Sequence, residues 1–262
     1  MSLKNIFTFL VLATSLMLGL PSCSDDTVPP VSFITTDGST AINSGDTLSL
    51  DFFDKGLSFE ILGGRGNYEI ENNHKDIVSF EYDGKALTIT PQGLGIATIG
   101  IEDVVGNTFT VYIKVSYYEE VYSVKTLDSE VDGADAMQIG QVKELKNRVK
   151  DESIVQPGGR YIFTFTNEER TLGSVNIYPT EKGNPMMAVF RKEEKFSESD
   201  GKKYQLYVIT LPSGDQHKMM LKEYPSAVDE IVLRKFEEDL TTTYKPEYAE
   251  LEKVVLIQEL NL

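Results

Sequence analysis

The stretch GIATIGIEDVVGNTFTVYIKV (residues 95–115) reads as a β-hairpin and sets the class of the fold. Apolar residues alternate with polar or small ones along both arms, the pattern of strands with one buried face. The alternating apolar residues are Ala97, Ile99, Ile101, Phe109, Val111, Ile113 and Val115. Gly106 and Asn107 provide the turn between the arms. The stretch therefore predicts two paired strands in a mainly β protein.

The same signals continue toward the N-terminus and define a domain over residues 31–116. IVSFEYDGKALTITP (77–91) predicts a second hairpin, with Asp83-Gly84 at its turn. DTLSLDF (46–52) and LSFEIL (57–62) alternate in the same way. About seven short strands separated by turn signals are typical of an immunoglobulin-like β-sandwich.

The order of these segments resembles the bacterial Ig-like modules found at the front of many surface lipoproteins. The resemblance runs from the glycine-rich GGRGNYEI (63–70) through both hairpins. It implies a sandwich that acts as a spacer or presents another domain. Asp103 and Asn107 carry oxygen ligands, but a calcium loop needs more carboxylates at alternating positions, so a hairpin turn is expected there.

Residues 117–262 predict a second domain of the α+β class, with one antiparallel sheet and one or two helices packed on a face. YYEEVYSV (117–124) predicts an entering strand, and residues 134–152 space apolar side chains along one side of a helix. Residues 237–251 are mostly helical by composition, with a break near Pro246. Strands are expected at 160–167, 173–179, 186–194, 202–212, 216–224 and 253–260. Residues 228–236 fit either a strand or the start of a helix.

The N-terminus predicts export and lipid anchoring. Residues 1–22 combine Lys4 with an apolar run of about 15 residues, too short for a comfortable membrane span, as in a secretory signal peptide. LPSC (20–23) resembles a bacterial lipobox, which implies that the sulfur of Cys23 carries a diacylglycerol and that the new amine is acylated with a fatty acid such as palmitate. Two or more acyl chains anchor a protein stably.

Residues 23–30 then form a lipidated tether containing two prolines. SDD (24–26) resembles the acidic motif that sends some lipoproteins to the outer face of the outer membrane. We therefore expect a lipid-anchored outer-membrane protein exposed at the cell surface, with the periplasmic face as the alternative.

Composition limits the partners. The chain has 41 acidic and 25 basic residues, a formal net charge of −16, which disfavours binding to nucleic acids. Its single cysteine excludes an internal disulfide bond. Trp is absent, so an aromatic binding platform must be built from Tyr or Phe.

No motif predicts catalysis, a cofactor or a metal site. His74 and His217 both lie in turn-like settings and are expected on the surface. Ser213, Asp215 and His217 are too close along the chain for the geometry of a catalytic triad. The adjacent acidic residues 168–169, 193–194 and 237–239 are expected to be solvated, because neighbours on a strand point in opposite directions.

Tyrosines are the better candidates for recognition. Tyr161, Tyr178, Tyr204 and Tyr207 lie on neighbouring predicted strands, and aromatic side chains on an open sheet can stack on sugar rings. Core packing is the simpler explanation for them.

The sequence therefore predicts a non-catalytic, lipid-anchored envelope protein, whose membrane contact is the lipid and whose C-terminal domain binds a glycan or another envelope protein. The alternatives are a hydrolase that uses acidic residues of the C-terminal domain, and a structural or assembly partner of outer-membrane proteins.

Overall fold

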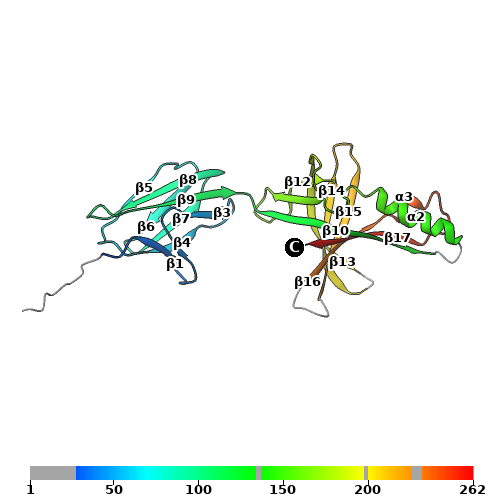
Figure 1. Ribbon diagram of the computed structural model, residues 1–262, viewed down its shortest axis with the longest axis horizontal. Helices are drawn as coiled ribbons and strands as arrows, with labels where there is room; N and C mark the ends of the chain where they lie inside the picture. Colours follow the sequence, from blue (N-terminus) through cyan, green and yellow to red (C-terminus); the bar gives the residue numbers. More distant parts are fainter. Residues whose placement is uncertain (1–27, 134–136, 198–199, 226–231, 262) are drawn as a thin grey trace, which may run out of the picture.

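The computed structural model describes residues 28–133, 137–197, 200–225 and 232–261 and shows a mainly β protein with antiparallel sheets. Figure 1 shows two bodies joined end to end: a pair of sheets formed by the N-terminal half, and a closed barrel that bears the helices at its far end. The predicted signal peptide and Cys23 lie outside the described residues.

The N-terminal body consists of two sheets. The first has the order β2 (Ala41–Ile42), β1 (Ser32–Thr35), β4 (Leu57–Leu62), β7 (Ala86–Pro91) and β6 (Val78–Tyr82). The second has the order β3 (Thr47–Asp51), β9 (Thr108–Ser116), β8 (Gly95–Glu102) and β5 (Glu69–Asn72). The β3–β9 pair is parallel, and every other pair in these two sheets is antiparallel.

One hydrophobic core lies between the two sheets, and the alternating residues of the two predicted hairpins contribute to it. Both hairpins are confirmed, because β6 pairs with β7 and β8 pairs with β9. Asp103 closes the β8–β9 turn by accepting hydrogen bonds from the backbone N–H groups of Val105 and Asn107. It also accepts one from the backbone of Arg65, which ties the glycine-rich loop to this turn.

The C-terminal body is a closed barrel of eight antiparallel strands in sequence order. The strands are β10 (Glu119–Asp132), β11 (Arg160–Phe165), β12 (Leu172–Tyr178), β13 (Met186–Ser197), β14 (Lys202–Thr210), β15 (Gln216–Pro225), β16 (Val232–Asp239) and β17 (Lys253–Asn261). Closure depends on β10, which pairs with β11 over Glu119–Ser123 and with β17 over Ser123–Asp132. Its register shifts between Val124 and Thr126, a β-bulge that bends the strand from one partner to the next.

Aromatic side chains fill the barrel. In an eight-stranded barrel the inward side chains suffice to fill the interior. Ring contacts between neighbours have centroid separations of 4.7 to 6.4 Å. The rings belong to Tyr122, Tyr161, Phe163, Phe165, Phe190, Tyr207 and Phe236.

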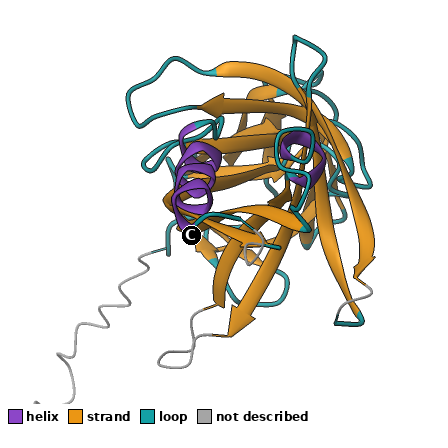
Figure 2. Ribbon diagram, turned by 90° about the vertical axis from the view of Figure 1, so that its right-hand side faces the viewer, coloured by secondary structure: helices purple, strands orange, loops and turns teal. Residues whose placement is uncertain are grey.

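The helices cover one end of the barrel (Figure 2). Helix α2 (Ile139–Asp151) buries Leu145 and Val149 against Leu256 and the segment that holds α3 (Thr241–Tyr244). Ser129 of β10 donates a hydrogen bond to the carbonyl of Lys146, which fixes the helix on the barrel.

Several details differ from the sequence-based expectations. The antiparallel sheet closes into a barrel, because β10 continues to Asp132, well beyond the end of the entering strand predicted at 117–124. The helix predicted at 237–251 is reduced to α3, since residues 237–239 belong to β16. Ile139, expected on the buried side of its helix, is 90% exposed. The predicted helix start at 134–136 lies outside the described residues.

The two bodies meet at Arg170, on the loop between β11 and β12. Its guanidinium donates a hydrogen bond of 2.7 Å to the carboxylate of Asp51 in β3 and lies 4.0 Å from the ring centroid of Tyr118. Asn167 shapes this loop, because its side-chain oxygen accepts hydrogen bonds from the backbone N–H groups of Thr171 and Leu172. The loop therefore holds Arg170, with φ of 52°, in position against the N-terminal body.

Candidate functional site

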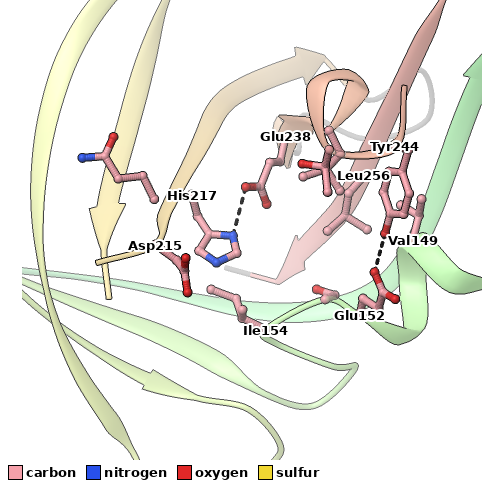
Figure 3. Close-up of a pocket in the computed structure, with 12 residues that line it drawn as sticks. Val149, Glu152, Ile154, Asp215, His217, Glu238, Tyr244 and Leu256 are labelled. Atoms are coloured by element: carbon pink, nitrogen blue, oxygen red, sulfur yellow. Dashed lines mark hydrogen bonds and ion pairs between the residues drawn. The ribbon is translucent and has the colours of Figure 1, made fainter. Parts of the chain in front are cut away.

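A cavity of about 340 Å³ opens at the helix-covered end of the barrel (Figure 3). Helix α2 and the residues after it form one wall, and the β14–β15 turn, β15, β16, α3 and β17 form the rest. Apolar side chains on this lining include Val149, Ile154 and Leu256. The polar lining includes Glu152, Asp215, His217, Glu238 and Tyr244.

His217 and Glu238 form the central pair of the cavity. The Nδ1 atom of His217 lies 3.0 Å from Oε1 of Glu238, whose side chain is only 8% exposed. The hydrogen bond to Glu238 raises the pKa of His217 above its ordinary value. Asp215 lies beside the imidazole ring in Figure 3. With Nδ1 engaged, the other ring nitrogen remains available to a ligand in the cavity.

Glu152 and Tyr244 form a second pair on the opposite wall. The hydroxyl of Tyr244 donates a hydrogen bond of 2.7 Å to Glu152 (Figure 3). Arg148 lies behind them and pairs with both Glu152 and Glu247, at 2.8 and 2.6 Å. The hydrogen bond from Arg148 lowers the pKa of Glu152, so this carboxylate is ionised at neutral pH.

Gln258 connects the cavity to the barrel core. It is 2% exposed, and its amide donates hydrogen bonds to Ser153, which lines the cavity, and to Tyr161. Its Oε1 atom is a buried acceptor with no hydrogen-bond partner within the described residues. Buried acceptors of this kind are uncommon in folded proteins.

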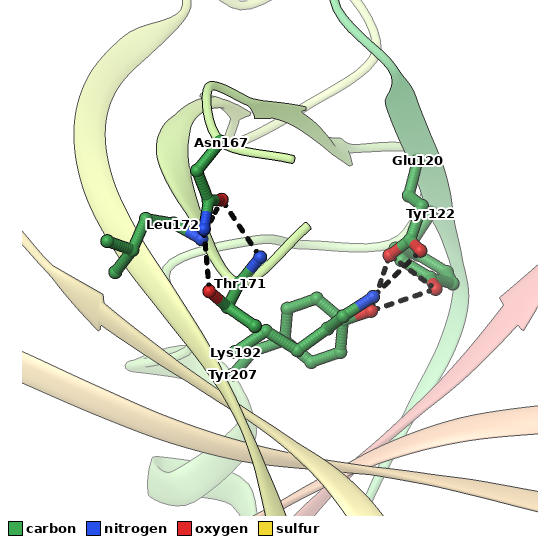
Figure 4. A network of polar contacts seen from close by, with 7 residues as sticks. All are labelled: Glu120, Tyr122, Asn167, Thr171, Leu172, Lys192 and Tyr207. Atoms are coloured by element: carbon green, nitrogen blue, oxygen red, sulfur yellow. Dashed lines mark hydrogen bonds and ion pairs between the residues drawn. The ribbon is translucent and has the colours of Figure 1, made fainter. Parts of the chain in front are cut away.

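A second polar cluster lies inside the barrel near the start of β10 (Figure 4). Glu120 accepts a hydrogen bond of 2.5 Å from the hydroxyl of Tyr207 and pairs with Lys192 at 3.0 Å. Tyr122 also donates to Glu120, at 3.2 Å, and burial raises its pKa to about 12. The ammonium of Lys192 lies 4.5 Å from the ring centroid of Phe165. Because every polar group here has a partner, the cluster serves the fold rather than a ligand.

The four tyrosines named from the sequence do not form one surface, so that prediction is wrong. Tyr161 and Tyr207 face the barrel interior and are 0% and 1% exposed. Tyr178 is half-buried beneath the guanidinium of Arg160, whose carbon lies 4.1 Å from the ring centroid. Tyr204 donates a hydrogen bond to Asp200, and the ammonium of Lys222 lies 5.4 Å from its ring centroid. An aromatic platform from these residues is therefore excluded.

The surface assignment of His217 is also wrong, because its side chain is only 21% exposed and pairs with Glu238. His74 is exposed, as expected. The alternation of side chains along β15 and β16 was the signal that could have predicted the inward orientation of His217 and Glu238. His217 lies two and four positions before the buried Met219 and Leu221, so the three residues share the inward face of β15. Glu238 shares the inward face of β16 with Phe236. No sequence pattern indicated that Glu152 and Tyr244 would line the cavity, because the tertiary packing of α2 and α3 brings them there.

Comparison with known proteins adds little. No protein-family model matches the chain, and no curated protein matches it. Among solved structures, the crystal structure of an EHEC O157:H7 intimin mutant is similar over 61% of this chain and 91% of that chain. The sequence identity is 11% and the TM-score 0.24, a likeness too weak to support any conclusion about fold or function.

Two further features are absent from the described residues. No helix in these segments is long and apolar enough to cross a membrane. No group of three or more His, Cys, Asp or Glu side chains in the same segments could hold a metal ion.

The Glu120 cluster yields a stability prediction. Lys192→Met keeps the apolar stem but leaves the largely buried Glu120 carboxylate without its cation, so we expect a loss of about 2–3 kcal/mol of unfolding free energy in urea titrations. Adding Glu120→Gln should restore part of the loss. The control Lys203→Met removes an exposed pair with Glu194 and should cost less than about 1 kcal/mol. Equal midpoints for Lys192→Met and the unaltered protein would contradict the assignment.

The His217–Glu238 pair yields a pH prediction. Because the pKa of His217 is raised on folding, its contribution to stability is complete below its ordinary value of 6.5 and disappears as the pH rises through the folded pKa. The difference in unfolding free energy between the unaltered protein and His217→Gln should therefore shrink as the pH rises from about 6 to about 9. His74→Gln, on an exposed turn, is the control. A pH-independent difference for His217→Gln would refute the pairing.

Proposed function

We propose that this chain is a non-catalytic, lipid-anchored lipoprotein of the outer membrane, in which an immunoglobulin-like sandwich is the spacer and the barrel binds a ligand at the cell surface. The lipobox at Cys23 and the SDD tether support the anchor and its location. The two sheets around one core support the Ig-like assignment, although the parallel β3–β9 pair and the number of strands were not expected.

The cavity at the helix-covered end of the barrel is the observation that carries the binding function. Its volume of about 340 Å³ lies at the lower end of small-molecule sites. Three carboxyl groups and His217 face apolar side chains such as Ile154 and Leu256 across it. Carboxylates accept hydrogen bonds from hydroxyl groups, and apolar walls suit the ring faces of a sugar. A neutral glycan end is therefore the ligand class that we propose.

The hydrolase alternative is favoured by one observation, the presence of Glu152, Asp215 and Glu238 on a single cavity. Glycoside hydrolysis needs one carboxylic acid that stays protonated near neutral pH. The lowered pKa of Glu152 makes it unsuitable as that acid. Glu152 is therefore a poor candidate for the acid, and binding without turnover is the function that we propose for this cavity.

Binding is tested with the full-length protein in neutral detergent and a panel of neutral oligosaccharides. We expect an oligosaccharide to bind, and Glu238→Gln to weaken its affinity by about tenfold, the loss of one charged hydrogen bond. Glu193→Gln, on an exposed pair with Arg191, is the matched control and should bind as the unaltered protein does. Absence of binding across the panel would reject the glycan, and release of reducing ends that Glu238→Gln abolishes would establish the hydrolase instead.

The anchor is tested by metabolic labelling. Radiolabelled palmitate should enter the expressed chain and should fail to enter a Cys23→Ala variant, because the sulfur is the attachment point and acylation of the new amine follows cleavage before Cys23. The variant should also leave the outer-membrane fraction. Equal labelling of both chains would refute the lipobox.

A further inference from the structure

A basic groove crosses the outside of the barrel, away from the His217 cavity. It has a volume of about 480 Å³ and is lined by side chains of β13 to β17, most of them on the outer face of the sheet. Lys218, Met220 and Lys222 point outward because the alternating Met219 and Leu221 belong to the barrel core. The groove therefore lies on a different face of the sheet from the residues of the proposed ligand cavity.

The charge of this groove opposes that of the chain. Its lining contains four lysines against Glu237 and Asp239, in a protein with a formal net charge of −16. Both acidic groups are already engaged: Glu237 pairs with Lys222 at 2.6 Å, and Asp239 accepts a hydrogen bond from the backbone of Thr241.

Three of the lysines have no anionic partner among the residues that the structure describes. Lys195, Lys218 and Lys253 are exposed and form no ion pair within the described part of the chain. In so acidic a protein, this cluster leaves positive charge available to an anionic ligand.

The floor between the lysines is apolar. Leu206 and Met220 are neighbours across β14 and β15, and Phe196 at the end of β13 is 58% exposed. A ligand that fills this groove therefore needs anionic groups for the lysines and an apolar face for the floor. Sugar rings that carry carboxylate or sulfate groups present both.

We infer that this groove binds an acidic polysaccharide, a second ligand class beyond the neutral glycan proposed for the cavity. An anionic bilayer is the less suitable partner, because a flat surface would also face the acidic remainder of the protein. A narrow chain can lie along the groove and contact the lysines alone.

The test measures polygalacturonate binding to the full-length protein in neutral detergent, with neutral dextran as the uncharged comparison. The double variant Lys218→Gln/Lys253→Gln should weaken polygalacturonate binding by about tenfold, and binding should fall with added salt. The matched control Lys75→Gln/Lys182→Gln removes two exposed lysines outside the groove and should bind normally. Lys218→Arg/Lys253→Arg should retain binding.

Three outcomes would overturn the inference: equal weakening in the control, equal binding of dextran, or no binding to polygalacturonate together with tighter binding to phosphatidylglycerol vesicles than to neutral phosphatidylcholine vesicles. The comparison of the two vesicles removes the contribution of the lipid anchor. Glu238→Gln should leave polygalacturonate binding intact. The oligosaccharide assay and the polygalacturonate assay therefore test the cavity and the groove independently, and either proposal can fail without the other.

Discussion

The C-terminal half depends on a single strand that pairs with two partners in succession. The first residues of β10 pair with β11 and the remainder with β17, and the bulge after Val124 turns the strand from one to the other. This arrangement joins the first and last strands of the barrel, so its eight-stranded sheet has no free edge. It also carries the last part of β10 beyond its pairing with β11, where α2 packs against it.

In the closed barrel, the buried polar side chains form two separate groups, the Glu120 cluster and the His217–Glu238 pair. The aromatic layer around Phe163 and Phe236 occupies the interior, and the Glu120 cluster and the His217–Glu238 pair are held by different residues at its margins. The first group satisfies its hydrogen bonds internally and specifies the packing of Tyr207 and Lys192. The second borders a cavity and leaves a histidine nitrogen and the Gln258 carbonyl unengaged within the described segments.

Local patterns predicted the local structure well. Period-two alternation and the turn residues located both hairpins, because register and turn chemistry are encoded by neighbouring residues. Closure of the barrel was not predicted, since the β10–β17 pairing joins residues more than a hundred positions apart. The candidate site was missed for the same reason: His217 and Glu238 each carry the phase of an inward residue, but their meeting depends on strand register across β15 and β16.

The junction at Arg170 has a mechanical consequence. The chain passes between the bodies only at residues 117–118, where a single backbone crossing would act as a swivel. The Arg170–Asp51 ion pair adds a second attachment beside that crossing and opposes bending of the two bodies toward or away from each other. The barrel's helix-covered end lies farthest from the N-terminal sheets in Figure 1. The cavity lined by α2 and α3 therefore lies on the part of the barrel that is remote from the N-terminal sheets.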